Sequence, residues 1–261
     1  MIIAVDGYEA NTANRVGIGR YAYEILKHMF QEGKRKKSLR LRSGQAKVES
    51  KQDFSFRIYI PEKPLPDMPK ETDWWQYRIA GPKKLWTFVG LPMALAVDQP
   101  RVDVVFSPTH YIPRFVDIPK VMSIMDLSYL HYPELFRAKD LHQLVHWTKY
   151  SVNHAQKILT ISKFSRDAII KEYGVRSDKV IVTYPGITME PKVKSPTFVK
   201  TMADKQKSKV LEKYHLNKDY ILSVGTLQPR KNFVRLIEAF SKIKVSNSSL
   251  ELVIVGKKGW L

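Results

Sequence analysis

Two adjacent cations near the end of the chain, Arg230 and Lys231, give the clearest chemical signal in the sequence. The apolar run 220–224 before them stops at Gly225, which is typical of a buried strand that ends in a turn. Asn232 then suits a helix N-cap, and the apolar residues after it recur with helical spacing. A helix start offers free backbone N–H groups, and arginine binds phosphate oxygens in pairs. We therefore predict a seat for a diphosphate, with two solvated cations at an ordinary helix start as the alternative.

A glycine-containing turn lies close to the N-terminus. The apolar run 2–5 is of the buried-strand type, Gly17, Gly19 and Arg20 follow in a turn, and an apolar stripe with helical spacing begins at Ala22. This order indicates the first half of a Rossmann-like unit, in which glycines let the backbone approach a ligand. A G-x-G pair without a third glycine is weak evidence for a phosphate site, so a tight turn alone is the competing interpretation.

Two polar side chains follow predicted strands in the middle of the chain. His110 closes the short run after strand 102–106, and Asp126 stands at the carboxyl end of strand 121–125. The carboxyl ends of parallel strands line the ligand crevice of open α/β sheets, so we expect both residues beside such a crevice. For His110, a structural histidine with satisfied hydrogen bonds is an equally open interpretation.

Metal-binding patterns are weak. His142 and His146 stand four residues apart on the predicted helix 139–154, but Gln143 occupies the position where H-E-x-x-H needs a glutamate, and no third ligand is evident. The sequence contains no D-x-D and no cysteine, which excludes thiolate zinc sites, a thiol nucleophile and disulfides. We therefore expect neither a metal nor a bound cofactor.

The composition, with 44% hydrophobic and 26% charged residues, is that of a globular domain. The formal net charge of +19 favours anionic partners, namely phosphorylated substrates, acidic lipid surfaces or nucleic acid. The densest basic run, 34–37, is either a solvated surface loop or a contact with an anionic membrane. No zinc-finger, RNP-type or heptad-plus-basic pattern occurs, so we do not expect nucleic acid.

The sequence shows neither a secretory leader nor a membrane-spanning segment. The first residues carry no basic stretch, and the longest apolar stretch, 85–97, is interrupted by Gly90 and Pro92 and is too short for a bilayer. We expect a cytoplasmic protein, with peripheral attachment to the inner membrane face as a further option.

The motifs resemble those of glycosyltransferase family 4, the retaining, metal-independent sugar transferases of GT-B fold. In that family V-G-T-x-x-P-R-K-N opens the second Rossmann-like domain, and residues 224–232 match it. Mannosyltransferase-type members often begin with a G-I-G-R-Y loop, which residues 17–21 match. The resemblance implies that Arg230 and Lys231 hold the diphosphate of a sugar nucleotide and stabilise it as it leaves. The resemblance also implies that Gly17, Gly19 and Arg20 line the wall of the cleft that faces the diphosphate. The acceptor would lie on the same side, near His110 and Asp126.

One position departs from the family pattern. The segment 123–133 resembles the family's T-I-H-D-L-s-x-L-x-x-P stretch, whose histidine contacts the transferred sugar, but Met125 stands at the histidine position. A thioether cannot donate a hydrogen bond or carry charge. Either a neighbour such as His110 substitutes, or the contact is dispensable, or activity is compromised. Retaining enzymes of this class use front-face attack with the leaving phosphate as base, so we assign no catalytic residue.

The resemblance predicts an α/β protein of GT-B type with a Rossmann-like N-terminal domain, residues 1–190, and a linker with a connecting helix, residues 191–214. Residues 215–261 would begin a nucleotide-sugar-binding domain. Apolar runs predict the strands 2–5, 102–106, 121–125, 157–161, 179–183, 220–224 and 250–255, and an alternating pattern predicts the strand 54–60. The family's donor domain continues further and carries an E-x7-E pair that holds the donor sugar and ribose. Neither glutamate position is present, so we expect a truncated form.

Two functions follow from these interpretations. The first is retaining transfer of a hexose from a nucleotide diphosphate sugar to a saccharide or lipid-linked acceptor in polysaccharide biosynthesis. The second is an inactive remnant that serves as a binding or membrane-surface module, which Met125 and the absent glutamate pair both favour.

Overall fold

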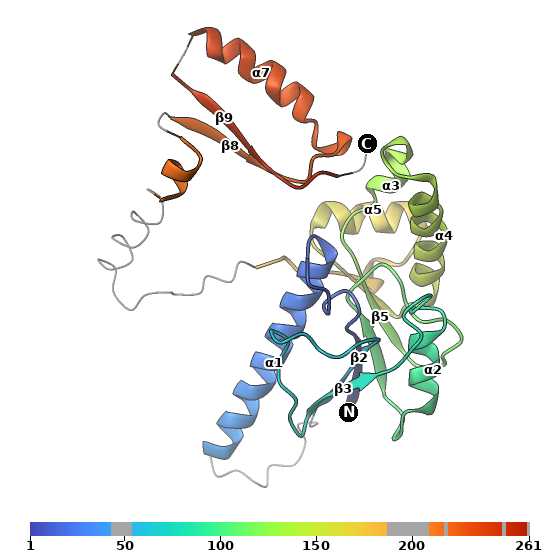
Figure 1. The fold of residues 1–261 in the computed structure, drawn as a ribbon. Helices are drawn as coiled ribbons and strands as arrows, with labels where there is room; N and C mark the ends of the chain where they lie inside the picture. The colour runs from blue at the N-terminus through green and yellow to red at the C-terminus, as the bar shows by residue number, and fades with distance from the viewer. Residues whose placement is uncertain (43–53, 187–208, 217–218, 247–248, 260–261) are drawn as a thin grey trace. The chain divides into compact units, whose positions relative to one another are not determined.

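The computed structural model describes residues 1–42, 54–186, 209–216, 219–246 and 249–259 (Figure 1). The chain divides into two compact units, residues 1–186 and 187–261. No helix among these described residues is both long and apolar enough to span a bilayer.

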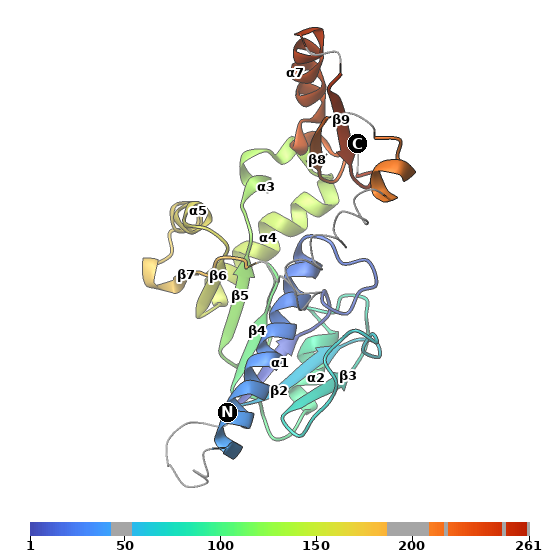
Figure 2. The same ribbon diagram turned by 90° about the vertical axis from the view of Figure 1, so that its left-hand side faces the viewer.

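The first unit is built on a seven-stranded parallel sheet in the order β3-β2-β1-β4-β5-β6-β7 (Figure 2). Parallel strands buried on both faces read as continuous apolar runs. Such runs predicted five of these strands, and the alternating pattern of residues 54–60 predicted β2. The strands are β1 (Ile2–Asp6), β2 (Ser55–Ile60), β3 (Trp75–Ile79), β4 (Val104–Ser107), β5 (Lys120–Ile124), β6 (Lys157–Thr160) and β7 (Val180–Val182).

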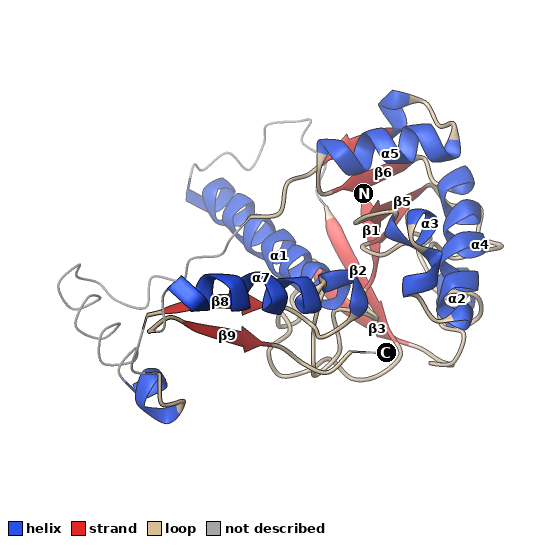
Figure 3. Cartoon of the chain, turned by 90° about the horizontal axis from the view of Figure 1, so that it is seen from above, coloured by secondary structure: helices blue, strands red, loops and turns tan. Residues whose placement is uncertain are grey.

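Helices cover both faces of this sheet. They are α1 (Ile18–Arg42), α2 (Gly90–Val97), α3 (Ser128–His131), α4 (Ala138–His154) and α5 (Lys163–Tyr173), with 3-10 turns at Pro133–Leu135 and Ser177–Lys179. Successive strand residues point to opposite faces, so Val5 packs with Leu26 of α1, whereas Ala4 packs with Leu91 of α2. Figures 1 and 3 show α1 on one face and α2 and α4 on the other. The result is the three-layer α/β arrangement that the sequence predicts.

The basic run 34–37 lies within α1, so its prediction as a loop was wrong. Lysine and arginine are good helix formers, and the helix continues through the run to Arg42. Arg35 pairs with Glu32 on the same helix at 2.8 Å, and Lys37 reaches Asp73 at 2.9 Å. Part of the charge of this run is therefore paired with carboxylates.

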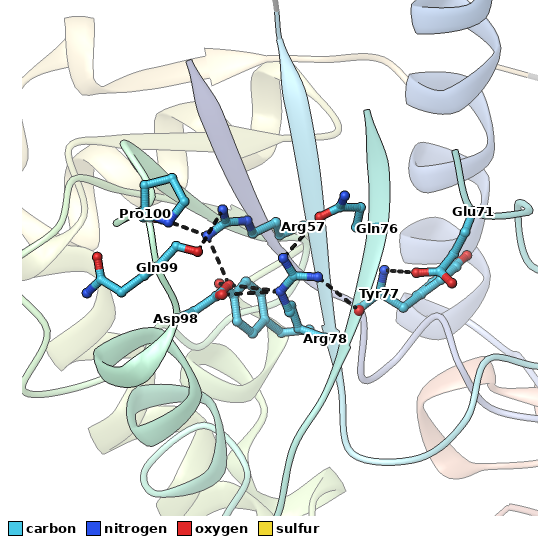
Figure 4. A network of polar contacts seen from close by, with 9 residues as sticks. Arg57, Glu71, Gln76, Tyr77, Arg78, Asp98, Gln99 and Pro100 are labelled. Carbon is cyan, nitrogen blue, oxygen red and sulfur yellow. Dashed lines mark hydrogen bonds and ion pairs between the residues drawn. The ribbon is translucent and has the colours of Figure 1, made fainter. Parts of the chain in front are cut away.

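A buried charged network joins β2 and β3 to the segment after α2 (Figure 4). The Arg57 guanidinium, its side chain 8% exposed, lies 3.1 Å from Asp98 and donates to the carbonyl of Pro100 at 2.6 Å. Arg78 Nε and the Tyr59 hydroxyl also donate to Asp98, at 3.2 and 2.5 Å. Burial alone would raise the pKa of Asp98, but these hydrogen bonds and charges lower it overall. Because its members satisfy one another, the network is structural rather than a ligand site.

The second unit contains two parallel strands, β8 (Tyr220–Val224) and β9 (Glu251–Val255), a 3-10 turn at Pro229–Lys231, and helix α7 (Phe233–Ser246). Both strands agree with the sequence prediction. Much of the predicted linker and connecting helix, residues 191–214, lies outside the described residues, and residues 209–213 are helical.

Candidate functional site

The carboxyl ends of the parallel strands form one edge of the first unit. Asp6 ends β1 there and is 2% exposed. It accepts hydrogen bonds from Trp86 Nε1 at 2.9 Å and from the backbone N–H of Tyr8 at 3.1 Å. Burial raises the pKa of Asp6 to about 6 despite these donors, and it also raises the pKa of the neighbouring Glu9, with the Asp6 charge as a second cause. Two carboxyls of raised pKa thus sit at the end of β1 and in the segment directly after it.

The glycine turn begins α1 at this edge, as the sequence predicts. Gly17 has φ of 53°, a left-handed conformation that favours glycine, and its carbonyl accepts from the Tyr21 N–H at 3.0 Å. A Cβ on Gly19 would lie 3.0 Å from the carbonyl oxygen of Glu9, so the turn packs closely on the segment that follows β1. The Arg20 guanidinium forms an ion pair with Glu24 on the same helix. The turn is therefore tight and lies against the backbone of Glu9.

Arg15 holds the glycine turn in place, a role that sequence reasoning missed. Its side chain is 8% exposed, and its guanidinium pairs with both oxygens of Asp67 and donates through Nε to the carbonyl of Ala10 at 2.5 Å. The same guanidinium lies 4.0 Å from the ring centroid of Tyr23, whose hydroxyl donates to the Asp67 carbonyl. Asp67 lies far along the chain, and only the fold brings it to Arg15.

His110 lies directly beside the position where Met125 replaces the family histidine. Its Nε2 accepts a hydrogen bond from the backbone N–H of Met125 at 3.2 Å. Burial lowers the pKa of His110 to about 4, although the Asp126 charge works in the opposite direction. The imidazole is therefore neutral at physiological pH, and because Nε2 accepts, the proton resides on Nδ1. His110 therefore accepts a hydrogen bond at Nε2 and has an N–H donor at Nδ1.

Asp126 is engaged in local structure. Its Oδ1 accepts from the backbone N–H of Ser128 at 2.9 Å and from the Ser128 hydroxyl at 2.6 Å. The carbonyl of the preceding residue, Met125, accepts from Ser165 Oγ at 2.9 Å. Since these bonds fix the backbone after β5, Asp126 acts at least in part by shaping the start of α3.

The predicted diphosphate seat lies in the second unit. Gly225 follows β8 and donates to the Val255 carbonyl at 2.9 Å, and a Cβ built on it would lie 3.9 Å from Cγ of Lys231. Arg230 and Lys231 are both exposed in the 3-10 turn between β8 and α7. Asn232 precedes the helix, and its carbonyl accepts from the Leu236 N–H at 3.3 Å. Its φ of 52° is left-handed rather than the extended backbone usual for an N-cap, a conformation that asparagine tolerates.

Gln228 is a residue of this turn that the sequence did not single out. It is 8% exposed, and among the described residues its Oε1 has no hydrogen-bond partner. Its neighbours Thr226, Leu227 and Gly259 pack tightly, since a Cβ on Gly259 would lie 2.5 Å from the Leu227 carbonyl. A buried acceptor without a donor is costly, so a donor from a bound molecule would satisfy it.

The predicted residues thus form two groups, one in each unit. The groups are Gly17, Gly19, Arg20, His110 and Asp126 in the first unit and Gly225, Arg230, Lys231 and Asn232 in the second. The rings of His142 and His146 lie 4.4 Å apart on α4, but across the described ranges no cluster of three histidine, aspartate or glutamate side chains could hold a metal.

Comparison with known proteins identifies the class and then the family. The fold is that of the GT-B glycosyltransferases: sucrose-phosphate synthase from Thermosynechococcus elongatus superposes with a TM-score of 0.50 at 10% identity, over 98% of this chain and 70% of that one. The family model "Glycosyltransferase Family 4" matches residues 16–190, and "Glycosyl transferases group 1" matches residues 204–261. The chain belongs to glycosyltransferase family 4.

Two curated relatives are mannosyltransferases. O-antigen chain mannosyltransferase B of Escherichia coli is 25% identical over 265 residues, which cover 94% of this chain and 61% of that protein. O-antigen chain mannosyltransferase RfbU of Salmonella typhimurium is 29% identical over 147 residues, 56% of this chain and 34% of that protein. A crystal structure of Anabaena HepE in complex with UDP superposes with a TM-score of 0.48 at 14% identity, over 97% of this chain and 69% of that one. The chain therefore spans less than two thirds of the length of these curated relatives.

Proposed function

We propose that the protein transfers a hexose, with retention of anomeric configuration, from a nucleotide diphosphate sugar to a saccharide or lipid-linked acceptor. The observation that carries the proposal is the turn 225–232, which pairs two exposed cations with the start of α7 in a chain of glycosyltransferase family 4. The two O-antigen mannosyltransferases support mannose as the hexose and polysaccharide synthesis as the setting.

The chemistry of the turn fits a leaving diphosphate. Negative charge grows on the phosphate oxygens as the bond to the sugar breaks, and fixed positive groups stabilise that charge most when they are already in place. Arg230 and Lys231 supply two such groups, and the N-terminal end of α7 adds its dipole. Gln228 offers a buried carbonyl oxygen that could accept from a hydroxyl or N–H of the donor.

The acceptor side belongs to the first unit in this proposal. The glycine turn leaves the backbone open, and His110 offers a neutral N–H donor at Nδ1 beside Met125. We infer that His110 provides the polar sugar contact that the thioether of Met125 cannot make. The transfer would require neither a metal ion nor a cofactor, and nucleic acid would not be a partner. The protein would act in the cytoplasm, with a lipid-linked acceptor bringing it to the membrane.

Nucleotide binding tests the diphosphate seat. We expect Arg230→Gln and Lys231→Gln each to weaken the binding of GDP or UDP, measured by calorimetry, by about tenfold or more, because each removes a charge-assisted hydrogen bond. Arg235→Gln, an exposed arginine in the first turn of α7 but outside the motif, is the matched control and should leave the affinity within about twofold. Unchanged nucleotide affinity in both turn variants would refute the proposed seat.

Met125 favours a second function, that of a binding module without turnover. Transfer from labelled GDP-mannose or UDP-hexoses to extracted saccharide and lipid acceptors distinguishes the two. For an active enzyme, we expect His110→Ala to lower transfer about tenfold, by the loss of its hydrogen bond to the sugar, and Met125→His in the same chain to restore part of it. Nucleotide binding without any detectable transfer would support the binding module instead.

A further inference from the structure

A stacked arginine stands on the surface of the first unit, four residues after His110 in the chain. Arg114 Cζ lies 4.6 Å from the ring centroid of Phe88 and 4.2 Å from that of Tyr150. Phe88 comes from the segment before α2 and Tyr150 from α4, and Trp147 of α4 packs on Phe88 with ring centroids 4.2 Å apart. The guanidinium is thus held between two aromatic faces supplied by different parts of the fold.

The charge of Arg114 is not neutralised within the described part of the chain. No carboxylate there lies within ion-pair distance of it, and the residue is half-exposed. Stacking occupies the faces of a guanidinium but leaves its N–H edge free. An edge of this kind, oriented in advance by two rings, suits the paired oxygens of a phosphate group.

Two exposed apolar residues with left-handed backbone stand next to this cluster in the chain: Phe115 directly follows Arg114, and Leu85 precedes Phe88 by three residues. Phe115 is 92% exposed with φ of 58°, and Leu85 is 55% exposed with φ of 57°. The Leu85 carbonyl accepts from the N–H groups of Phe88 and Val89, both at 2.9 Å, so its conformation is tied to the segment that carries Phe88. A bulky side chain at positive φ is strained, and its exposure to water gives no compensating burial. Strain retained at two such positions points to a function for this surface.

The segments that carry Leu85 and Phe115 pack on the same face of the sheet as α2, since Trp86 belongs to the core cluster of that face. Val116 and Ile118, just after Phe115, belong to the same core cluster as Leu91 and Leu95 of α2. Figures 1 and 3 show α2 and α4 together on that face. We call the set Leu85, Phe88, Arg114, Phe115 and Tyr150 the arginine patch.

We propose that the arginine patch docks the protein on an anionic lipid surface, with Arg114 binding a lipid phosphate and Phe115 and Leu85 entering the headgroup region. A cation beside exposed apolar side chains is the pattern of interfacial membrane binding, and the net charge of +19 would draw the protein toward such a surface. A phosphate ion in solution would match Arg114 but would leave the exposed, strained Phe115 without a partner. The inference names a membrane contact that can be measured without any sugar transfer.

Vesicle co-sedimentation of the whole chain tests the patch, with vesicles of equal parts phosphatidylglycerol and phosphatidylcholine. We expect Phe115→Asn to weaken binding about tenfold, through the loss of apolar burial. Asparagine adopts positive φ readily, so the same variant should keep or raise the Tm, which separates a lost contact from a lost fold. Arg114→Gln should weaken binding about fivefold.

Two control variants replace residues of the same types on other parts of the first unit. Phe164→Asn removes another exposed phenylalanine, 82% exposed on α5, and Arg176→Gln removes another exposed arginine, and neither should change vesicle binding. Equal losses in these controls, full binding by Phe115→Asn, or no binding of the unaltered protein would overturn the proposal. Complete release of the protein from the vesicles by inorganic phosphate would also overturn it, because it would indicate a site for soluble phosphate. The same holds if vesicle binding is weakened only by Lys34→Gln and Lys36→Gln in α1.

Nucleotide affinity measured on the same variants separates this inference from the proposed function. GDP and UDP binding should be unchanged in Phe115→Asn and Arg114→Gln, because neither residue belongs to the turn 225–232. Loss of vesicle binding with intact nucleotide binding in Phe115→Asn and Arg114→Gln supports the arginine patch. Loss of nucleotide binding with intact vesicle binding in Arg230→Gln supports the donor seat.

Discussion

Replacing Asp6 with asparagine should stabilise the protein at neutral pH. Asp6 is 2% exposed, and burial raises the pKa of its carboxyl from 3.8 to about 6. Both hydrogen bonds that it accepts, from Trp86 Nε1 and from the Tyr8 N–H, reach the same atom, Oδ1. An asparagine in the same orientation presents its carbonyl oxygen to both donors and carries no charge. The substitution therefore removes the cost of burying a carboxylate without leaving either donor unpaired.

The size and sign of the effect follow from the pKa. A rise from 3.8 to about 6 corresponds to about 3 kcal/mol, since one pKa unit is worth about 1.4 kcal/mol. A carboxyl whose pKa rises on folding favours the folded state while it is protonated. Its contribution is fully present below pH 3.8 and is lost as the pH rises through about 6. Asp6→Asn should thus gain up to about 3 kcal/mol above that range and close to nothing below about pH 4.

Urea unfolding at a series of pH values measures this difference directly. The free energy of unfolding of Asp6→Asn minus that of the unaltered protein should grow from about zero at pH 4 to its full value near pH 8. The exposed Asp117→Asn is the matched control and should show no such trend. A difference that does not depend on pH, or an Asp6→Asn protein that is less stable at pH 8, would refute the reasoning.

Three further substitutions test packing around the sheet. Asp98→Ala leaves the buried Arg57 without its carboxylate and should cost about 3–5 kcal/mol in urea unfolding; a cost below about 1 kcal/mol contradicts this. Gly33→Ala should lower the Tm despite the helix propensity of alanine, because its Cβ would lie 2.5 Å from the Trp74 ring; a higher Tm argues against it. Ser162→Ala removes the side-chain cap of α5 and should cost about 1 kcal/mol, seen as faster hydrogen exchange in its first turn; unchanged exchange is inconsistent with the cap.

Much of the fold could be predicted because an uninterrupted apolar run indicates a strand that is buried on both faces of the sheet. The runs that became β1, β4, β6 and β8 are rich in branched apolar residues, and their order along the chain indicates a parallel α/β sheet. The strand β3 gave no such run, since Gln76 and Arg78 alternate with aromatic residues after a proline-rich segment. Arg78 lies there because it joins the Asp98 network, a contact between distant residues that local pattern does not encode.

The candidate site was partly predictable for the same reason. Gly17, Gly19, Arg230 and Lys231 stand in local motifs, and each lies in a turn at the end of a strand or the start of a helix. The partner that fixes Arg15 is 52 residues away, so its role depends on the fold. The positive φ of Phe115 had no local signal either, because the sequence there shows no glycine or asparagine.

The position of β1 in the sheet has a consequence for synthesis. β1 leaves the ribosome before either of its neighbours, yet it pairs with β2 on one edge and with β4 on the other. The second neighbour is complete only at Ser107, so at roughly 5–20 residues per second the nascent strand waits on the order of 5–20 s for its last partner. During that interval the apolar segment Ile2–Val5 needs shielding by the ribosome surface or a chaperone.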